Sequence, residues 1–449
     1  MIVMKFGGSS VESASAIARV ASIVGARLHR KPVVVVSAMG KTTNRLLAIA
    51  QAAVSGDRAA ARLQLRDLEK YTLAEGASAN GQVEAHFREL SDLVNGLAVL
   101  GELTPRSVDA ISAYGERISS LVVAELFQRH GIDAVHADAR DYIVTDERHS
   151  QAAPLYAETY DRLAKLEQLA AGRVAVMGGF IGSTRAGVTS TLGRGGSDFS
   201  ASIVGAGIGA EEIQIWTDVD GMLTCDPRIL AGGHRVKTIS FAEAAELAYF
   251  GAKVLHPSTV APAIEKNIPV SILNSRRPDA GGTRIVAEGV PCSNTFKSIA
   301  CKPDITLVHI RSMRMLMAYG FLRRIFEAFE RHETPVDLIA TSEVSVSVTI
   351  DNTRNLDAVA AELSQIADVT VESGQAIVCM VGENIATTPG IGARVFQSIA
   401  GINVRMVSHG ASSLNLSFVV NGKDLAGAVE LLHREFFATL DPEVFETPS

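Results

Sequence analysis

Short, strongly apolar runs alternate with longer amphipathic segments over residues 1–280. Runs that are apolar at every position, such as VVVV at 33–36, are typical of strands covered by helices on both faces. Their alternation with helical patterns predicts a mainly parallel sheet in a three-layer α/β/α domain. Thr104, Pro105 and Gly131 mark the ends of one predicted helix over 106–130. The strand candidates are 2–6, 33–36, 133–135, 174–177, 213–216 and 270–273.

A second pattern follows the turn-rich stretch RRPDAGGTRIVAEG at 276–289, and it occurs twice. In each copy a strand leads through a glycine to a helix, FLRRIFEAFERH or ARVFQSIA, and then to two more strands. Duplicated β-α-β modules of this kind usually bind or couple rather than catalyse. The predicted strands are 306–310, 336–339 and 344–350 in the first copy and 377–381, 403–407 and 414–420 in the second. The predicted domains are 1–290, 300–375 and 376–449.

The composition narrows the class of protein. The chain has 449 residues, 47% hydrophobic and 20% charged, which is the mix of an ordinary folded protein of about three domains. Its net charge of −7 argues against a protein that wraps nucleic acid or lies on an anionic membrane. No apolar run approaches the roughly 20 residues of a membrane helix, and MIVMKFGGSS lacks the apolar stretch of a signal peptide. Four scattered cysteines without metal spacing fit a reducing, cytoplasmic compartment.

The first strand ends in a lysine followed by glycines. Lys5 is costly at a buried position unless it meets an anion. Gly7 and Gly8 allow close backbone approach, and a helix starting near Ser13 would direct N–H groups at the same place. A phosphate cradle is the functional interpretation. The alternative is a lysine that extends from the strand edge into solvent.

The motif TLGRGGSD at 191–198 places an arginine between glycines just before a helical run. Ser197 or Asp198 is predicted to cap that helix. The planar fork of Arg194 suits a carboxylate or a phosphate. Glu116 falls within a helix patterned for burial, and a buried lone carboxylate needs a cationic partner.

Two other glycine motifs carry little weight. VVSAMGKT at 35–42 follows a strand, but a P-loop requires glycine where this chain has Val35. GAGIGA at 205–210 spells a dinucleotide fingerprint, yet it ends a helix and precedes a strand, which is the reverse of the required order. We therefore interpret the second motif as a helix end with close packing.

A strand end opens into an Asp/Gly-rich loop at WTDVDGMLTCDPR, where parallel sheets bind ligands. Thr217 and Asp218 are candidate nucleotide contacts, whereas Asp220 with its following glycine is equally well explained as a plain turn. Downstream, FGAKVLHP offers Lys253 as a second phosphate-binding cation, and His256 is better explained as structural.

Together, the motifs KFGGSS, GERISSLV, GFIGS, TLGRGGSD, WTDVDGMLTCDPR and FGAKVLHP resemble those of aspartate kinases, in the same order and over essentially the whole chain. The duplicated module resembles the paired, ferredoxin-like ACT domains that follow the kinase domain in this family. The chain is too short to include the fused homoserine dehydrogenase that some members carry.

The resemblance implies ATP-dependent phosphorylation of the β-carboxylate of L-aspartate to 4-phospho-L-aspartate, with Mg²⁺, as the first committed step toward lysine, threonine and methionine. An aspartate side chain has a reference pKa of about 3.9, so this nucleophile is ionised and needs no general base. The task is to bring two anions together and to stabilise the transferred phosphoryl group. Lysines and glycine loops suit that task.

By this resemblance, Lys5 would contact the ATP phosphates and Asp198 would organise the catalytic lysines. Arg194 would pair with the substrate α-carboxylate, Glu116 with its ammonium group, and Thr43 would fix its orientation. The protein itself supplies no metal site in this interpretation. The residues expected to line the nucleotide site are Lys5, Gly7, Gly8, Thr217, Asp218, Leu223, Arg228, Lys253 and Val254.

The resemblance also implies a homodimer, or a higher homo-oligomer, with an amino-acid effector in the ACT pair, and L-lysine is the leading candidate. Many relatives carry tyrosine where this chain has Leu223, and some carry His and Ser at Met317 and Ala318. The expected effector residues are Met315, Ala318, Phe321, Leu322, Val336, Asp337, Ser342 and Glu343.

Two other functions stay open from the sequence. One is another amino-acid or carbamate kinase of the same superfamily, although Arg194 with Glu116 favours an amino-acid substrate. The other is a catalytically silent amino-acid sensor. An inactive relative should have lost at least one of the catalytic candidates, whereas Lys5, Asp198 and Lys253 are all present.

Overall fold

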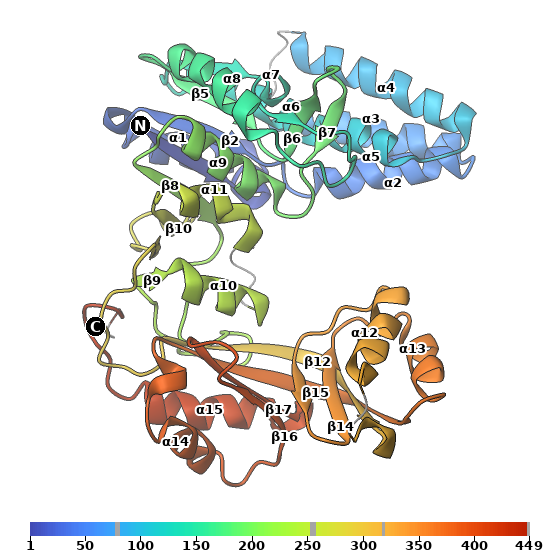
Figure 1. The fold of residues 1–449 in the computed structure, drawn as a ribbon. Helices are drawn as coiled ribbons and strands as arrows, with labels where there is room; N and C mark the ends of the chain where they lie inside the picture. Colours follow the sequence, from blue (N-terminus) through green and yellow to red (C-terminus); the bar gives the residue numbers. More distant parts are fainter. Residues whose placement is uncertain (77–80, 252–256, 317–318, 447–449) are drawn as a thin grey trace. The chain divides into compact units, whose positions relative to one another are not determined.

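The computed structural model describes residues 1–76, 81–251, 257–316 and 319–446. They form two compact units, each with its own sheet (Figure 1). The first unit comprises residues 1–222 and 254–288, and the second comprises 223–253 and 289–449. The segment 223–253, which lies inside the predicted first domain, therefore clusters with the second unit.

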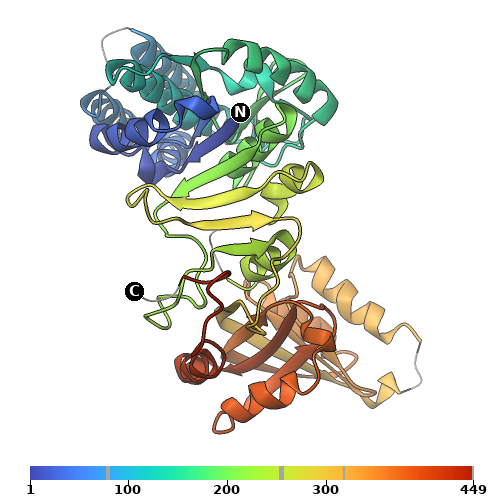
Figure 2. The same cartoon turned by 90° about the vertical axis from the view of Figure 1, so that its left-hand side faces the viewer.

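The first unit contains the predicted parallel sheet. In its described part, strands lie in the order β3-β5-β2-β1-β8-β10-β11. Neighbours from β3 to β10 are parallel, and β11 is antiparallel to β10. All six predicted strands of this region are confirmed, and Figure 2 shows β8, β10 and β11 side by side in green to yellow. The bounds are β1 Ile2–Phe6, β2 Pro32–Val36, β3 Ala134–Ala137, β5 Val174–Gly178, β8 Glu212–Thr217, β10 Val270–Asn274 and β11 Thr283–Val286.

Helices cover both faces of this sheet. Ile2, Met4 and Phe6 of β1 point into a core shared with α1 and α6. On the other face α9 packs on β1 and β8, and α8 and α11 pack on α9. Burial of both faces explains why β1 is apolar at every position except Lys5. The helices concerned are α1 Ala14–Gly25, α6 Tyr114–Arg129, α8 Tyr156–Leu169, α9 Gly196–Gly207 and α11 Ala261–Glu265.

Three further helices, α2, α3 and α4, pack together beside the sheet (Figure 1). A small sheet of β4, β6 and β7 also belongs to the first unit. The remaining bounds in this unit are α2 Thr42–Val54, α3 Arg58–Ala74, α4 Gln82–Leu100, α5 Pro105–Ser112, α7 Ala139–Tyr142, β4 Val144–Thr145, β6 Ile181–Thr184 and β7 Thr189–Thr191.

The single helix predicted over 106–130 is wrong, because the structure has two helices, α5 and α6, that meet at Ala113. The predicted start is confirmed, since the Thr104 side chain caps α5 and Pro105 is its first residue. The break directs α6 toward the end of β2, where a Cβ on Gly115 would lie only 2.8 Å from the Cβ of Ala38. Gly115 lowers the helix propensity beside the break, but an isolated glycine is tolerated within a helix and does not by itself predict an end.

The second unit contains an antiparallel sheet of the order β13-β14-β12-β15-β17-β16 within the described residues. Helices α12 and α13 pack with β12 and β14 around one core. The strand bounds are β9 Thr238–Ser240, β12 Ser298–Arg311, β13 Ile339–Thr341, β14 Ser345–Ile350, β15 Asp368–Val381, β16 Val404–His409 and β17 Asn415–Asn421. The helix bounds are α10 Phe241–Tyr249, α12 Phe321–Arg331, α13 Leu356–Leu363, α14 Ile391–Ser398 and α15 Leu425–Phe436.

The two predicted copies share this sheet. The long strands β12 and β15 pair over 298–302 with 377–381 and over 305–311 with 368–375, with irregularities in register on either side of Ile305. The predicted division at 375/376 therefore falls inside β15. The predicted strand at 336–339 is wrong, because β13 begins at Ile339 and the preceding residues only exchange irregular backbone hydrogen bonds with Thr349.

Candidate functional site

The carboxyl ends of the central strands build the candidate site. After β1, the Gly7 N–H donates to the carbonyl of Trp216 at the end of β8, and the Gly40 N–H donates to the carbonyl of Gly8. A Cβ on Gly8 would lie 2.8 Å from the carbonyl oxygens of Ala38 and Gly40. Glycine is needed at this position because the loops after β1 and β2 approach each other so closely.

A cavity of about 340 Å³ opens at this edge of the sheet. It brings together six of the residues proposed from the sequence, which come from strands, helices and loops far apart in the chain. Those six are Lys5, Gly8, Thr43, Glu116, Arg194 and Asp198.

Lys5 meets a carboxylate within the cavity. Its Nζ lies 2.6 Å from Oδ1 of Asp198, and both side chains are largely buried. Asp198 stands in the first turn of α9, where the helix dipole favours negative charge. The prediction that Ser197 or Asp198 caps this helix is wrong, because the N-cap is Gly195, at φ 72°, and no side chain caps it. Asp198 is thus left to pair with the lysine.

Glu116 is the most unusual ionisable group of the cavity. Its Oε1 accepts a hydrogen bond from the backbone N–H of Ala38 at 3.1 Å. Its Oε2 is buried and has no hydrogen-bond partner among the described residues. Burial raises the pKa of this carboxyl to about 8. The group is therefore mostly protonated at neutral pH, and a cation brought into the cavity would ionise it.

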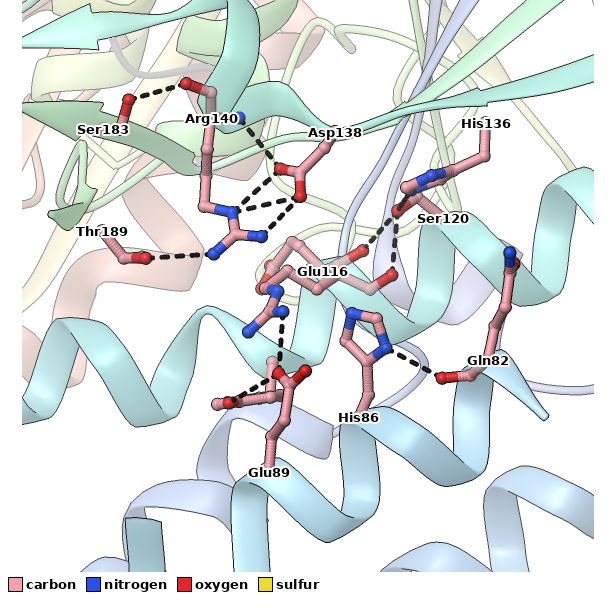
Figure 3. A network of polar contacts seen from close by, with 12 residues as sticks. Gln82, His86, Glu89, Glu116, Ser120, His136, Asp138, Arg140, Ser183 and Thr189 are labelled. Carbon is pink, nitrogen blue, oxygen red and sulfur yellow. Dashed lines mark hydrogen bonds and ion pairs between the residues drawn. The ribbon is translucent and has the colours of Figure 1, made fainter. Parts of the chain in front are cut away.

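The far side of Glu116 is fixed by a polar network (Figure 3). Ser120 Oγ donates to the Glu116 carbonyl and lies 3.0 Å from Nε2 of His136. Burial lowers the pKa of His136, which favours the neutral ring. In the same region Arg140 binds Asp138 through two nitrogens. The contact between Ser120 and His136 ties α6 to β3 one turn after Glu116.

Arg194 and Thr43 complete the polar lining. Arg194 is exposed and stands between Gly193 and Gly195, both with positive φ. It makes no ion pair within the described part of the chain, so its guanidinium is available to an anion. Thr43 belongs to the first turn of α2 and is half-buried. The cavity thus offers two cationic groups and one carboxyl group with a free oxygen.

The nucleotide residues expected from the sequence are divided between the two units. Thr217 ends β8 and Asp218 follows it. Because β8 pairs with β1 in parallel, both residues lie at the same edge of the sheet as Lys5. Leu223 and Arg228 belong to the second unit, and Arg228 forms an ion pair with Asp226. Lys253, Val254 and His256 lie outside the described residues.

Sequence reasoning missed several residues that line the cavity. Phe180 is the most informative, because it adopts a left-handed conformation at φ 66°, which is uncommon for a bulky residue. It follows β5, so the carboxyl end of a predicted strand was the available signal. The cavity residues that had no predicted ligand-binding role, although several stood in the quoted motifs, are Ser37, Ala38, Gly40, Phe180, Gly193, Gly195, Gly196 and Ser197.

The expected effector residues cluster around the first copy in the second unit. Met315 ends a short 3-10 helix, Phe321 and Leu322 begin α12, and Ser342 with Glu343 forms the turn between β13 and β14. The remaining described ones, Val336 and Asp337, lie just before β13, and Ala318 lies outside the described residues.

Asp337 already has a cationic partner. Its Oδ1 accepts from Nζ of Lys302 at 2.7 Å, and the same nitrogen lies 2.7 Å from Asp351. Burial raises the pKa of Asp337.

None of the described helices combines the length and apolar character needed to cross a bilayer. Among the same residues, no three His, Cys, Asp or Glu side chains are grouped so that they would hold a metal ion.

Comparison with known families gives a consistent result. The model of the amino acid kinase family matches residues 1–274, and an ACT-domain model matches 308–361 and 378–436. Chloroplastic aspartokinase 1 of Arabidopsis thaliana is 39% identical, over 98% of this chain and 80% of its own. Lysine-sensitive aspartokinase 3 of Escherichia coli is 36% identical, over 97% of this chain and 99% of its own.

Solved structures agree with these matches. E. coli aspartokinase III in complex with aspartate and ADP is similar with a TM-score of 0.82 at 35% identity, covering 97% of this chain and 100% of its own. The same enzyme in complex with lysine and aspartate gives a TM-score of 0.85, covering 97% and 99%.

Proposed function

The chain belongs to the aspartokinases of the amino acid kinase family, and on that premise we propose how its residues carry out the reaction. An oxygen of the β-carboxylate of L-aspartate attacks the γ-phosphorus of ATP. The bond from that phosphorus to the β,γ-bridging oxygen breaks. The products are 4-phospho-L-aspartate and ADP.

The observation that carries this proposal is one cavity with opposite charges at fixed places. The ammonium group of aspartate would lie at the free oxygen of Glu116, and the α-carboxylate would pair with Arg194. Thr43 would contribute a hydroxyl to its orientation. A substrate held by its ammonium group and its α-carboxylate has its β-carboxylate in a fixed orientation. This orientation of the reacting group is one contribution to catalysis.

Lys5 would act on the phosphoryl group. Its ion pair with Asp198 holds the ammonium group inside the cavity, close to the loop of Gly7 and Gly8. There it would lower the repulsion between the two reacting anions and stabilise the charge of the transition state. Asp198 is a positioning residue in this scheme, since it acts through Lys5.

Magnesium would be held chiefly by the nucleotide. Mg²⁺ in kinases is usually bound by substrate phosphates, water and one or two carboxylates. That mode fits a cavity in which Asp198 is the carboxylate nearest to Lys5. When bound, the ion supplies charge stabilisation to the β- and γ-phosphates. Thr217, Asp218, Leu223, Arg228, Lys253 and Val254 are the proposed contacts for the rest of the nucleotide.

The ACT pair is proposed to bind L-lysine as a feedback effector and to mediate formation of a homodimer. A lysine-sensitive E. coli relative similar over nearly the whole chain supports this proposal. Lysine must then bind an inactive arrangement more tightly than an active one, because equal binding shifts no equilibrium. The proposed contacts are Met315, Ala318, Phe321, Leu322, Val336, Asp337, Ser342 and Glu343.

Trapping the acyl phosphate tests the reaction directly. The chain is incubated with ATP, Mg²⁺, L-aspartate and hydroxylamine, with L-glutamate replacing aspartate as the control. Aspartyl hydroxamate formed only with aspartate is the expected result. Its loss on adding L-lysine would support the effector, product insensitive to lysine would contradict lysine as the effector, and no product would contradict the kinase assignment.

A further inference from the structure

The two copies in the second unit carry matching polar pairs. Strand β14 begins at Ser345, and Ser342 stands three residues before it. Strand β17 begins at Asn415, and Ser412 stands three residues before it. The same spacing at the same place in the fold gives both loops two hydrogen-bonding side chains at the start of a central strand.

In the second copy this pair holds a carboxylate from the chain itself. Ser412 Oγ donates to Oε1 of Glu246, and Asn415 Nδ2 donates to Oε2 of the same residue, each at 2.7 Å. Both oxygens of one carboxylate are therefore satisfied by two separate donors. Glu246 lies on α10, 166 and 169 residues away from them in sequence.

The geometry of the pair is fixed independently of Glu246. Asn415 is only 9% exposed, and its Oδ1 accepts from Ser417 Oγ. That contact orients the amide so that Nδ2 faces Glu246. Ser412 Oγ accepts from the backbone N–H of Leu414, which holds its hydroxyl in the loop. The donors are thus held in place by contacts of their own.

The position of α10 is fixed one turn earlier. Glu243 closes a capping box with Ser240, and its Oε2 lies 3.0 Å from Nζ of the buried Lys297. This buried ion pair sets the helix against the sheet and places Glu246 at the loop. Among the described residues of the second unit Glu246 makes no ion pair, and the donors to its carboxylate are the neutral groups of Ser412 and Asn415.

The first copy differs at this point. Ser342 Oγ and Ser345 Oγ lie 2.7 Å apart and form a hydrogen bond with each other at an exposed position. The equivalent pair is therefore self-bonded in one copy and occupied by a carboxylate in the other.

We propose that Ser412 and Asn415 form a carboxylate-binding site of the second copy, which the side chain of Glu246 fills as an internal ligand. The site would accept a small free carboxylate, including the α-carboxylate of an amino acid, only when Glu246 is withdrawn.

Chemical rescue tests this proposal on the full chain, with acetate as the probe and chloride at equal ionic strength as the reference. Glu246→Ala vacates the site and is expected to lower the melting temperature of the second unit by a few degrees. Acetate should restore that loss, because it binds the native state alone. Line broadening of labelled acetate should be greater with Glu246→Ala than with the native chain, whose cavity around Arg194 can also bind acetate.

Matched variants separate a vacated site from a general loss of stability. Glu246→Gln keeps the volume filled and should bind no more acetate than the native chain. Glu430→Ala removes an exposed glutamate of α15 and should show no rescue. Adding Ser412→Ala and Asn415→Leu to Glu246→Ala should abolish rescue.

Acetate binding to Glu246→Ala no greater than to the native chain, or rescue that survives loss of both donors, would overturn the proposal. Absence of both rescue and acetate binding in a folded Glu246→Ala chain would also overturn it. None of these readouts requires kinase activity or lysine, so they fail independently of the proposed function.

Discussion

Two glutamates on the two units show opposite uses of a buried or half-buried carboxylate. Glu116 has one oxygen held by a backbone N–H and the other without a partner among the described residues, and its pKa is raised to about 8. Glu246 has both oxygens satisfied by side-chain donors of the same unit. The first carboxyl group is incomplete until a ligand arrives, whereas the second already acts as a ligand.

The lysines of the two regions repeat this difference. Lys5 has one carboxylate partner and lines an open cavity. Lys297 is 1% exposed and lies between two glutamates, Glu243 at 3.0 Å and Glu383 at 3.2 Å. A charged group that lines a cavity and can still bind a ligand is suited to catalysis or binding. A charged group enclosed by its partners fixes structural elements against each other.

The largest expected effect is loss of the cavity lysine. Lys5→Ala should lower kcat by at least about two to three orders of magnitude, because a preorganised cation at the transferred group is lost. Lys165→Ala, which removes an exposed lysine of α8, should leave kcat unchanged. Steady-state kinetics with circular dichroism measures both, and near-normal turnover of a folded Lys5→Ala chain would refute the role assigned to Lys5.

Lys297→Met should remove the buried ion pairs of Lys297 with Glu243 and Glu383 and lower the free energy of unfolding. Two glutamates would lose their common cation, and removal of one partner from a buried ion pair costs about 3–5 kcal/mol. Urea unfolding followed by a probe in the second unit should show this loss. The exposed Lys423→Met is the matched control. Equal stability of the two variants would mean that the enclosed charges do not anchor α10.

Much of the first unit was predictable because its signal is local. Each strand of the parallel sheet is apolar at nearly every position, so 2–6 and 33–36 were identified from composition alone. Glycine motifs marked the loops at the strand ends. The carboxyl of Glu116 stood out for a related reason, since it interrupts a helix patterned for burial.

The missed features depend on contacts between distant segments. The break at Ala113 serves the close approach of Gly115 to Ala38, which no local pattern encodes. Phe180 is left-handed and packs against a segment distant in sequence, where a Cβ on Gly196 would lie only 2.7 Å from its ring. Glu246 stands in an ordinary amphipathic helix, and only the folded chain shows what it binds.

Glu116→Gln replaces the carboxyl group that has an unpartnered oxygen and tests whether it binds the substrate ammonium group. Loss of a charged hydrogen-bond partner for the substrate ammonium costs about 1.5–3 kcal/mol, so the KM for aspartate should rise roughly 10-fold to 100-fold with a smaller change in kcat. An unchanged KM would contradict the assigned contact.

The Glu116→Gln variant should lack the part of the stability loss between pH 6 and pH 8 that Glu116 causes in the native chain. The pKa of Glu116 falls from about 8 in the folded chain to about 4.5 on unfolding, so the unfolded state binds fewer protons between these values. The free energy of unfolding therefore declines as pH rises through that window. Glutamine has no such titration, and melting temperatures at pH 6 and pH 8 should differ less for Glu116→Gln than for the native chain.

The smallest expected effect is the pH dependence of substrate binding. Aspartate requires the ionised form of Glu116, whose pKa without ligand is about 8. Binding below that pH must first remove a proton, so the KM for aspartate should fall roughly fivefold from pH 7 to pH 8 and level off at higher pH. Glu116→Gln should flatten this profile while its KM stays high. A native profile that is flat across this range would show that the carboxyl is already ionised, and Glu116 would then resemble Glu246 as a group whose partners are all in place.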